Sequence, residues 1–132
     1  MKKILLFTLA LIITNLLYSQ FHISTKICET FSWNQGAWVL TNQDNEVSTL
    51  FDFNKEMTMF THTTATISSS YYIKSSSHTE EKIWEYDIVS DVGNNYHFIL
   101  DLKNNNLRFI GKNKDGSLFL VRHTIKRSWS DD

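Results

Sequence analysis

Large apolar side chains that alternate on both sides of a short loop constrain the fold of this chain most strongly. They occupy every second position around Asp91-Val92-Gly93: Trp84, Tyr86 and Ile88 before it, and Tyr96, Phe98, Leu100 and Leu102 after it. With a three-residue loop, Ile88 lies opposite Tyr96 and all these side chains share one face. Gly93 then takes the left-handed conformation that closes such a loop and that a Cβ disfavours. The pattern predicts a β-hairpin with one apolar face.

The same alternation continues through two further predicted hairpins. The first has a two-residue turn at Asn104-Asn105, because asparagine tolerates the positive φ that such turns require. The second has a three-residue loop at Lys114–Gly116 that again ends in glycine. In the first hairpin, Leu102 then lies opposite Leu107. In the second, Phe109 lies opposite Val121, and Gly111 lies opposite Phe119. Gly111 relieves crowding beside Phe119 or marks a bulge.

The first half of the chain shows the same period with weaker turn signals. A three-residue loop at Asn54–Glu56 pairs Phe53 with Met57, since a two-residue turn divides the apolar residues between the two faces. The other predicted elements are a first strand on the odd positions Ile23, Ile27, Phe31 and Trp33, a polar turn at Asn42–Asn45 after Trp38-Val39-Leu40, and a strand with Ile67, Tyr71 and Ile73 that enters a polar loop at Ser75–Thr79.

These patterns predict an all-β domain of about eight short antiparallel strands in an up-and-down meander. No segment of eleven or more residues repeats its apolar positions with a helical period. The chain contains no proline, a residue that often keeps the exposed edge of a sheet from pairing with other chains. A closed sheet avoids this problem because it has no exposed edge. We therefore expect a closed or flattened barrel over residues 20–132, with a β-sandwich as the alternative.

The first nineteen residues have the composition of an export signal. Met1-Lys2-Lys3 is a short positive start, typical of bacterial signals, and the mostly apolar run Ile4–Tyr18 follows it. A helix formed by this run is shorter than the hydrocarbon core of a bilayer, which is roughly 30 Å thick. Ser19 suits a signal-peptidase site, so we expect residues 1–19 to be a cleaved secretory signal peptide. The mature chain is then periplasmic or secreted, with no membrane span.

Charge and motifs exclude several function classes. The formal net charge is −1, whereas nucleic-acid binding needs a basic surface. Glu85, Asp87 and His97 occupy the face opposite the aromatic rows, which disfavours an outer-membrane barrel. The chain has no motif of a serine hydrolase, zinc protease, phosphate loop or calcium loop. We therefore expect no catalytic residues and no cofactor.

Histidine and cysteine positions show no metal-ligand spacing. No two of the five histidines lie close together in the sequence, as zinc ligands commonly do. The strand pattern predicts that His62 and His97 face outward, that His78 lies in a loop and that His123 lies near the inner row. Cys28 is the single cysteine, and we expect a buried thiol, with a reactive nucleophile or an intermolecular bridge as alternatives. The sequence predicts no metal site.

Aromatic side chains are the residues best suited to carry a function. Two interpretations remain open: they line a ligand pocket, or they fill the barrel, since an eight-stranded interior just accommodates its own side chains. The candidates for pocket or core are Trp38, Trp84, Tyr86, Tyr96, Phe98 and Phe109.

Gly36-Ala37-Trp38 resembles the Gly-x-Trp signature near the first barrel strand of lipocalins. The resemblance covers these three residues and one arginine. It implies a barrel that carries a small apolar molecule, with Arg122 or Arg127 packed over Trp38. The leading hypothesis is thus an exported, non-catalytic binding protein for a small apolar ligand. The alternatives are a secreted interaction module for a protein or polysaccharide partner and, third, a hydrolase-type enzyme.

Overall fold

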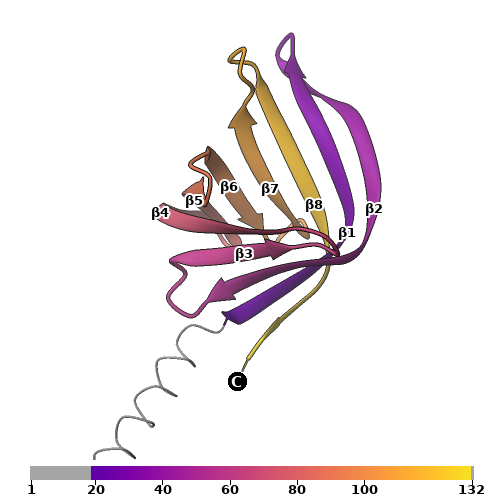
Figure 1. Ribbon diagram of the computed structural model, residues 1–132. Helices are drawn as coiled ribbons and strands as arrows, with labels where there is room; N and C mark the ends of the chain where they lie inside the picture. Colours follow the sequence, from indigo (N-terminus) through magenta and orange to yellow (C-terminus); the bar gives the residue numbers. More distant parts are fainter. Residues whose placement is uncertain (1–18, 132) are drawn as a thin grey trace, which may run out of the picture.

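Each strand of the chain pairs with the next one, and the last strand, β8, pairs with the first, so that the sheet closes into a barrel (Figure 1). This computed structural model describes residues 19–131; most of the predicted signal peptide lies outside them. The predicted antiparallel meander of eight strands is confirmed, as a closed barrel. The strands are β1 (Ser19–Asn34), β2 (Ala37–Asn54), β3 (Met59–Thr63), β4 (Ser68–Glu80), β5 (Ile83–Ser90), β6 (Asn95–Asp101), β7 (Asn106–Lys112) and β8 (Leu118–Ser130).

Two predicted hairpins are confirmed residue by residue. In β5–β6, Ile88 lies opposite Tyr96, and the loop closes on Gly93 with a φ of 87°. In β7–β8, Gly111 lies opposite Phe119. A Cβ on Gly111 would stand 2.7 Å from the Phe119 ring, so the glycine relieves crowding. The alternation of apolar residues, together with a glycine in the left-handed region of each loop, fixed the register of both hairpins.

The β6–β7 hairpin has a different register from the predicted one. Leu107 lies opposite Leu100, not Leu102, because β6 ends at Asp101 and a four-residue stretch replaces the two-residue turn. The Asp101 carboxylate accepts a hydrogen bond from the Asn104 backbone N–H at 2.9 Å, which stabilises the longer loop. A shift of two residues leaves every side chain on its predicted face.

The predicted β2–β3 register is wrong by an odd number of residues, which exchanges the two faces of β3. Phe53 lies opposite Phe60 rather than Met57. The Asn54 side-chain oxygen accepts hydrogen bonds from the backbone N–H groups of Thr58 and Met59, at 2.9 and 3.2 Å. These bonds stabilise the longer loop. In consequence Phe60 and His62 point into the barrel, and the predicted outward position of His62 is wrong.

Two predicted breaks are strand instead. The stretch Asn42–Asn45 belongs to β2, and Ser75–Thr79, with His78, belongs to β4. β2 does contain an irregularity: Thr25 pairs with Thr49 but Ile27 pairs with Asn45, so residues 46–48 form a bulge. We call these residues the β2 bulge. A bulge bends the strand and redirects its side chains.

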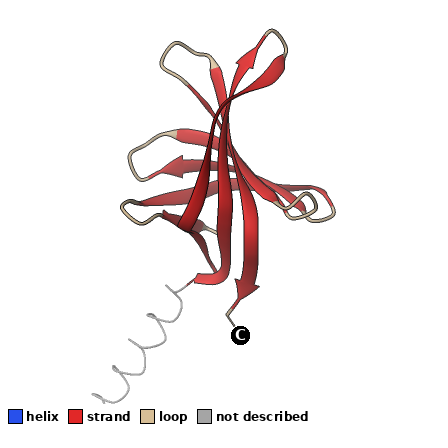
Figure 2. Cartoon of the chain, turned by 90° about the vertical axis from the view of Figure 1, so that its right-hand side faces the viewer, coloured by secondary structure: helices blue, strands red, loops and turns tan. Residues whose placement is uncertain are grey.

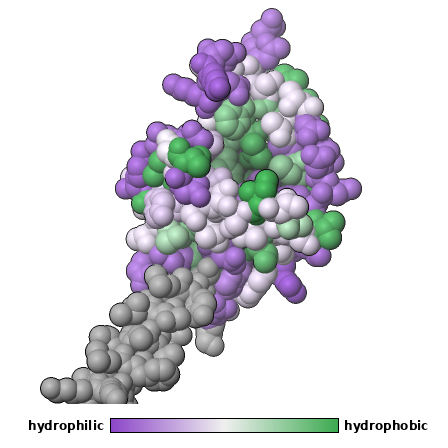
Figure 3. All heavy atoms as spheres, viewed as in Figure 1, coloured by the Kyte–Doolittle hydropathy of each residue, from purple (hydrophilic) through white to green (hydrophobic). Residues whose placement is uncertain are grey.

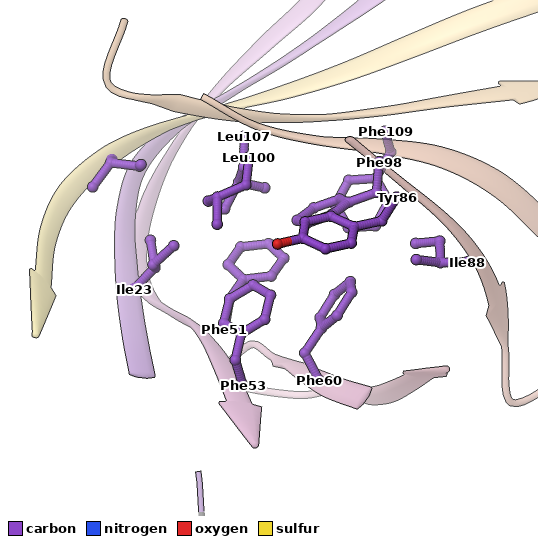
Figure 4. Close-up of a cluster of buried hydrophobic side chains, with 11 residues drawn as sticks. Ile23, Phe51, Phe53, Phe60, Tyr86, Ile88, Phe98, Leu100, Leu107 and Phe109 are labelled. Atoms are coloured by element: carbon purple, nitrogen blue, oxygen red, sulfur yellow. The ribbon is translucent and has the colours of Figure 1, made fainter. Parts of the chain in front are cut away.

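Aromatic rings fill the interior of the barrel (Figure 4). The ring of Phe98 contacts those of Phe60 and Phe109, with centroid distances of 4.8 and 4.9 Å, and these two are 6.2 Å from each other. Phe51 and Phe53 complete the cluster from β2, and neither is exposed to solvent. Tilted and offset rings at these separations attract each other beyond their burial. The lower part of the barrel is therefore a packed core.

Two hairpins extend beyond this core. In Figure 1 the tips of β1–β2 and β7–β8 reach above the ends of β3–β6, and Figure 2 shows the same tips spread apart. We call this extension, residues 29–42 and 109–121, the wing, and the open end of the barrel beneath it the mouth. Figure 3 shows a hollow on this side of the molecule with apolar residues in its floor and hydrophilic residues around it.

Candidate functional site

A small pocket lies on the inner face of the sheet at the mouth. Its volume is about 170 Å³, and its walls come from β3, β4, β6, β7 and β8. The lining residues are His62, Tyr71, Tyr96, Phe109, Phe119, Val121 and His123. A wider, more polar hollow of about 780 Å³ shares Tyr96 and Phe119 with it. The two spaces therefore adjoin each other at these two rings.

His62 brings an unpaired nitrogen to this pocket. Its ring stacks on Phe51 with a centroid distance of 4.3 Å. Its Nε2 atom is buried and has no hydrogen-bond partner within residues 19–131. Burial, and to a smaller extent His123, lower the pKa of His62 to about 4, so the ring is neutral at neutral pH. Because Nε2 is closed off from solvent, movement of the His62 ring has to expose this nitrogen before it can form a hydrogen bond with a ligand in the pocket.

His123 is held by a carboxylate from the β2 bulge. The His123 side chain is 4% exposed, and its Nδ1 lies 2.9 Å from Oε1 of Glu46. Glu46 also accepts a hydrogen bond from the Thr25 hydroxyl at 3.0 Å. Burial alone would raise the pKa of Glu46, but the hydrogen bonds from His123, Thr49 and Thr25 outweigh it and lower that pKa. The bulge therefore places an ionised carboxylate on the inner face of the barrel.

Cys28 completes this cluster from β1. It lies opposite His123 in the β1–β8 ladder, and its thiol is free and half-buried. Burial raises the pKa of Cys28 to about 11, and the carboxylates of Glu46, Asp44 and Glu29 act in the same direction. The group is thus a protonated thiol at neutral pH rather than a reactive nucleophile.

The outer face of the wing carries an apolar patch. Directly opposite residues of antiparallel strands share a face, and the ladder pairs Trp33 with Trp38 and Phe31 with both Leu40 and Leu120. Leu40 is 47% exposed and Trp33 45%. A groove of about 310 Å³ crosses this patch, lined by Phe31, Trp38, Ile99, Arg108, Ile110, Leu120 and Arg122. We call these side chains, with Trp33 and Leu40, the outer patch.

Both arginines of the outer patch are paired within the chain. Arg122 forms an ion pair with Glu29 at 3.0 Å, and Arg108 pairs with the buried carboxylate of Asp101 at 3.2 Å. The guanidinium of Arg122 also lies 4.9 Å from the centre of the Phe31 ring. The patch is therefore apolar and close to electrically neutral.

His97 lies elsewhere on the outer face, as its position in the strand predicted. Its Nε2 is 2.6 Å from Glu85, and its Nδ1 is 3.3 Å from Asp87. Burial alone would lower the pKa of His97, but the hydrogen bonds that its ring donates to Glu85 and Asp87 raise that pKa above its usual value.

The six aromatic candidates are distributed over four environments. Tyr86 and Phe98 are buried in the core, and Phe109 and Tyr96 lie at its border and line the pocket. Trp84 packs against the core and stacks on His78 with ring centroids 5.2 Å apart. Trp38 lies in the outer groove.

The lipocalin resemblance implied an arginine packed over Trp38; Arg122 lines the same groove as Trp38, but its guanidinium lies over another ring. Arg122 lies over Phe31 and Arg127 over Trp129. Gly36 has its own explanation in the β1–β2 turn, where it and Gln35 have φ values of 82° and 50°. Two successive positive φ angles are typical of the tight turn that joins two such strands.

Sequence reasoning did not single out Glu46 or His62 as site residues. Glu46 reaches the inner face only because of the β2 bulge, and His62 only because of the longer β2–β3 loop. No local spacing signals either arrangement. Comparison with known proteins found no matching family model, curated protein or solved structure. Within the described residues, no helix has the length and apolar character needed to cross a membrane.

Proposed function

We propose that this protein is a non-catalytic binding protein that holds a small apolar ligand in the pocket at the mouth. The observation that carries the proposal is the pocket itself, which is aromatic and apolar except for the two histidines. Ligand sites typically combine such walls with few polar groups. An apolar cavity of about 150 Å³ suffices to bind benzene, so a volume of 170 Å³ suits a ligand of about one ring.

The unpaired nitrogen of His62 adds a polar requirement to this ligand. A buried polar atom without a partner costs free energy that a ligand recovers by hydrogen bonding to it. The rings of Tyr71 and Phe109 contact each other, with centroids 5.4 Å apart, and together form an aromatic wall of the pocket. The best fit is a planar, mostly apolar molecule with one hydrogen-bonding atom, such as indole or a phenol.

Isothermal titration with indole and phenol tests this proposal. We expect saturable binding that Val121→Phe abolishes, because the added ring fills the pocket that Val121 lines. Val92→Phe is the matched control: it adds the same ring on a loop residue that is 78% exposed, and binding is expected to persist. No saturable binding of either probe, or binding that Val121→Phe leaves unchanged, would contradict the proposal.

We also propose export to the periplasm or the exterior, with removal of residues 1–19. The charged start, the apolar run and Ser19 support this proposal. N-terminal sequencing of the protein from the periplasm or medium of a bacterial host is expected to begin at Gln20. Retention of the full chain in the cytoplasm would contradict it.

A second candidate function, an interaction surface for a protein partner, is favoured by the outer patch. Protein interfaces are enriched in tryptophan, phenylalanine and arginine at their centres. Because both arginines are neutralised within the chain, two such patches face each other without like-charge repulsion. The occupant we propose is therefore a second copy of this chain in a two-fold dimer.

Light scattering after size-exclusion chromatography over a range of concentrations tests the dimer. We expect the wild-type protein to dimerise and Leu40→Asp to be monomeric, since the charge enters the centre of the apolar face. Val47→Asp is the control, because Val47 is 92% exposed on the same strand, in the β2 bulge. A wild-type protein that is monomeric at every concentration overturns this candidate. Retention of that monomer on a polysaccharide matrix would indicate a polysaccharide partner instead.

A further inference from the structure

Three side chains with metal-binding atoms meet on the inner face where the wing joins the barrel. They are Cys28 from β1, Glu46 from the β2 bulge and His123 from β8. One ligand atom from each lies within 4.8 Å of the other two. A thiol, a carboxylate and an imidazole in such proximity form a donor set that zinc proteins use.

We propose that Cys28, Glu46 and His123 bind a zinc ion. Thiolate and imidazole donors favour zinc over magnesium or calcium, which prefer oxygen donors. Three protein ligands leave a fourth tetrahedral position for water or for a polar atom of a ligand. His123 also lines the pocket, so the proposed zinc site adjoins the pocket.

The backbone already holds the three ligands at a suitable spacing. Cys28 and His123 are direct partners in the β1–β8 ladder. Glu46 is anchored by the Thr25 hydroxyl and touches His123 at 2.9 Å. Donor atoms in a tetrahedral zinc site lie about 3.5 Å apart. The Cys28 sulfur lies within 4.8 Å of the other two donor atoms, so it has to approach them by at most about 1 Å. Rotation of the Cys28 and His123 side chains supplies such a movement without a change in the strands.

The surrounding charge also favours a cation. Asp44 lies opposite Cys28 in the β1–β2 ladder and shares its face, whereas Glu29 points to the other face, where it is paired with Arg122. When zinc binds, the S–H bond of Cys28 breaks, an S–Zn bond forms and the proton passes to the buffer. The hydrogen bond that His123 Nδ1–H donates to the ionised Glu46 is replaced by a bond from each residue to the metal, and the Nδ1 proton is exchanged through the buffer for one on Nε2, so that the ring stays neutral. No oxidation or reduction occurs.

The inference does not rest on the proposed binding of an apolar ligand. Binding of an aromatic probe depends on the pocket walls formed by Tyr71, Phe109 and Val121. Binding of the metal depends on Cys28 and Glu46, which do not line the pocket. Either one is able to fail while the other succeeds. The two proposals are therefore tested by separate measurements on the same protein.

Cobalt substitution provides the sharpest test, because Cys28 is the single cysteine of the chain. We expect the purified protein, treated with a chelator and then titrated with Co²⁺, to show a sulfur-to-cobalt charge-transfer band in the near ultraviolet at one equivalent. Zn²⁺ is expected to displace the cobalt and remove the band. Cys28→Ser is expected to lack the band. His97→Gln, which changes a histidine on the outer face, is expected to keep it.

A second readout remains informative if Cys28→Ser fails to fold. Zinc is expected to slow alkylation of the wild-type Cys28 thiol by iodoacetamide at least tenfold, and Glu46→Gln is expected to weaken zinc binding at least tenfold. The proposal is overturned by the absence of zinc binding, by a cobalt spectrum without the sulfur band, or by zinc binding that Glu46→Gln leaves unchanged. Tight binding of copper without any binding of zinc also overturns it.

Discussion

The packed lower part of the barrel and the open mouth beneath the wing use inward aromatic side chains in different ways. Phe98, in the lower part, is fully buried and contacts the rings of Phe60 and Phe109. Phe119, on the inner face of the wing, is only partly buried, and its ring is 6.3 Å from that of Tyr96. Strands surround Phe98 on all sides, whereas β3–β6 end below the tip of the wing (Figure 1). Inward side chains therefore form a core where the wall is complete and a pocket where it is not.

The largest expected effect is the loss of a core ring, and it tests this comparison directly. Phe98→Ala leaves a cavity that the surrounding rings cannot close, so we expect a loss of about 3–5 kcal/mol in the free energy of unfolding. Phe119→Ala removes the same atoms at the mouth, where solvent already reaches them, and is expected to cost about 1 kcal/mol. Urea denaturation of both variants provides the measurement. Equal losses would contradict the division into core and mouth.

A methyl group added at Gly111 sharpens the same comparison. The new Cβ would stand 2.7 Å from the tip of the Phe119 ring and 2.9 Å from Tyr96. Overpacking in a closed core costs about 1–3 kcal/mol. Because the Phe119 ring is able to swing into the mouth, we expect Gly111→Ala to cost about 1–2 kcal/mol by urea denaturation. A loss as large as that of Phe98→Ala would show that the mouth is as rigidly packed as the core.

The registers of the four hairpins show what the sequence was able to predict. Alternation and glycine loops predicted the β5–β6 and β7–β8 hairpins correctly, because both signals are local. The other two registers depend on side chains that hold longer loops, Asp101 before β7 and Asn54 before β3. These residues are ordinary polar residues in the sequence, and only the folded chain shows which backbone groups they bind.

The candidate site was hidden for a related reason. Ile23 points into the core, but Lys26 has no partner in either ladder of β1, so the alternation changes face there. Beyond this irregularity Cys28 faces inward and Phe31 faces outward, although simple counting of odd positions places Phe31 with Ile23. Bulges shift the period by one residue and leave no reliable mark in a single sequence.

A smaller effect concerns His97, the outward histidine, and it depends on pH. The hydrogen bonds that His97 donates to Glu85 and Asp87 outweigh burial and raise the pKa of His97 above 6.5. The protonated form therefore stabilises the folded state fully below pH 6.5, and this contribution is lost as the pH rises through the raised pKa. Since His97 is 40% exposed, solvent screening limits it to about 0.5 kcal/mol.

Comparison of the wild-type protein with His97→Gln from pH 5.5 to about 8.5 isolates this contribution. We expect the wild-type protein to be more stable at the acidic end and the difference to shrink as the pH rises. Glu85→Gln, which removes the closer of the two carboxylates, is expected to reduce the same pH dependence. A difference that grows with rising pH would contradict the assigned sign.

The smallest expected effect is on the outer patch. Leu40→Ala removes a side chain that is 47% exposed, and at a protein concentration low enough for monomers it is expected to change stability by less than about 0.5 kcal/mol. At high concentration the same change removes apolar area from the proposed dimer and is expected to lower the midpoint of thermal unfolding relative to the wild-type protein. A variant equally destabilised at both concentrations would show that Leu40 belongs to the core of the monomer, and the outer patch would then lose its role as an interface.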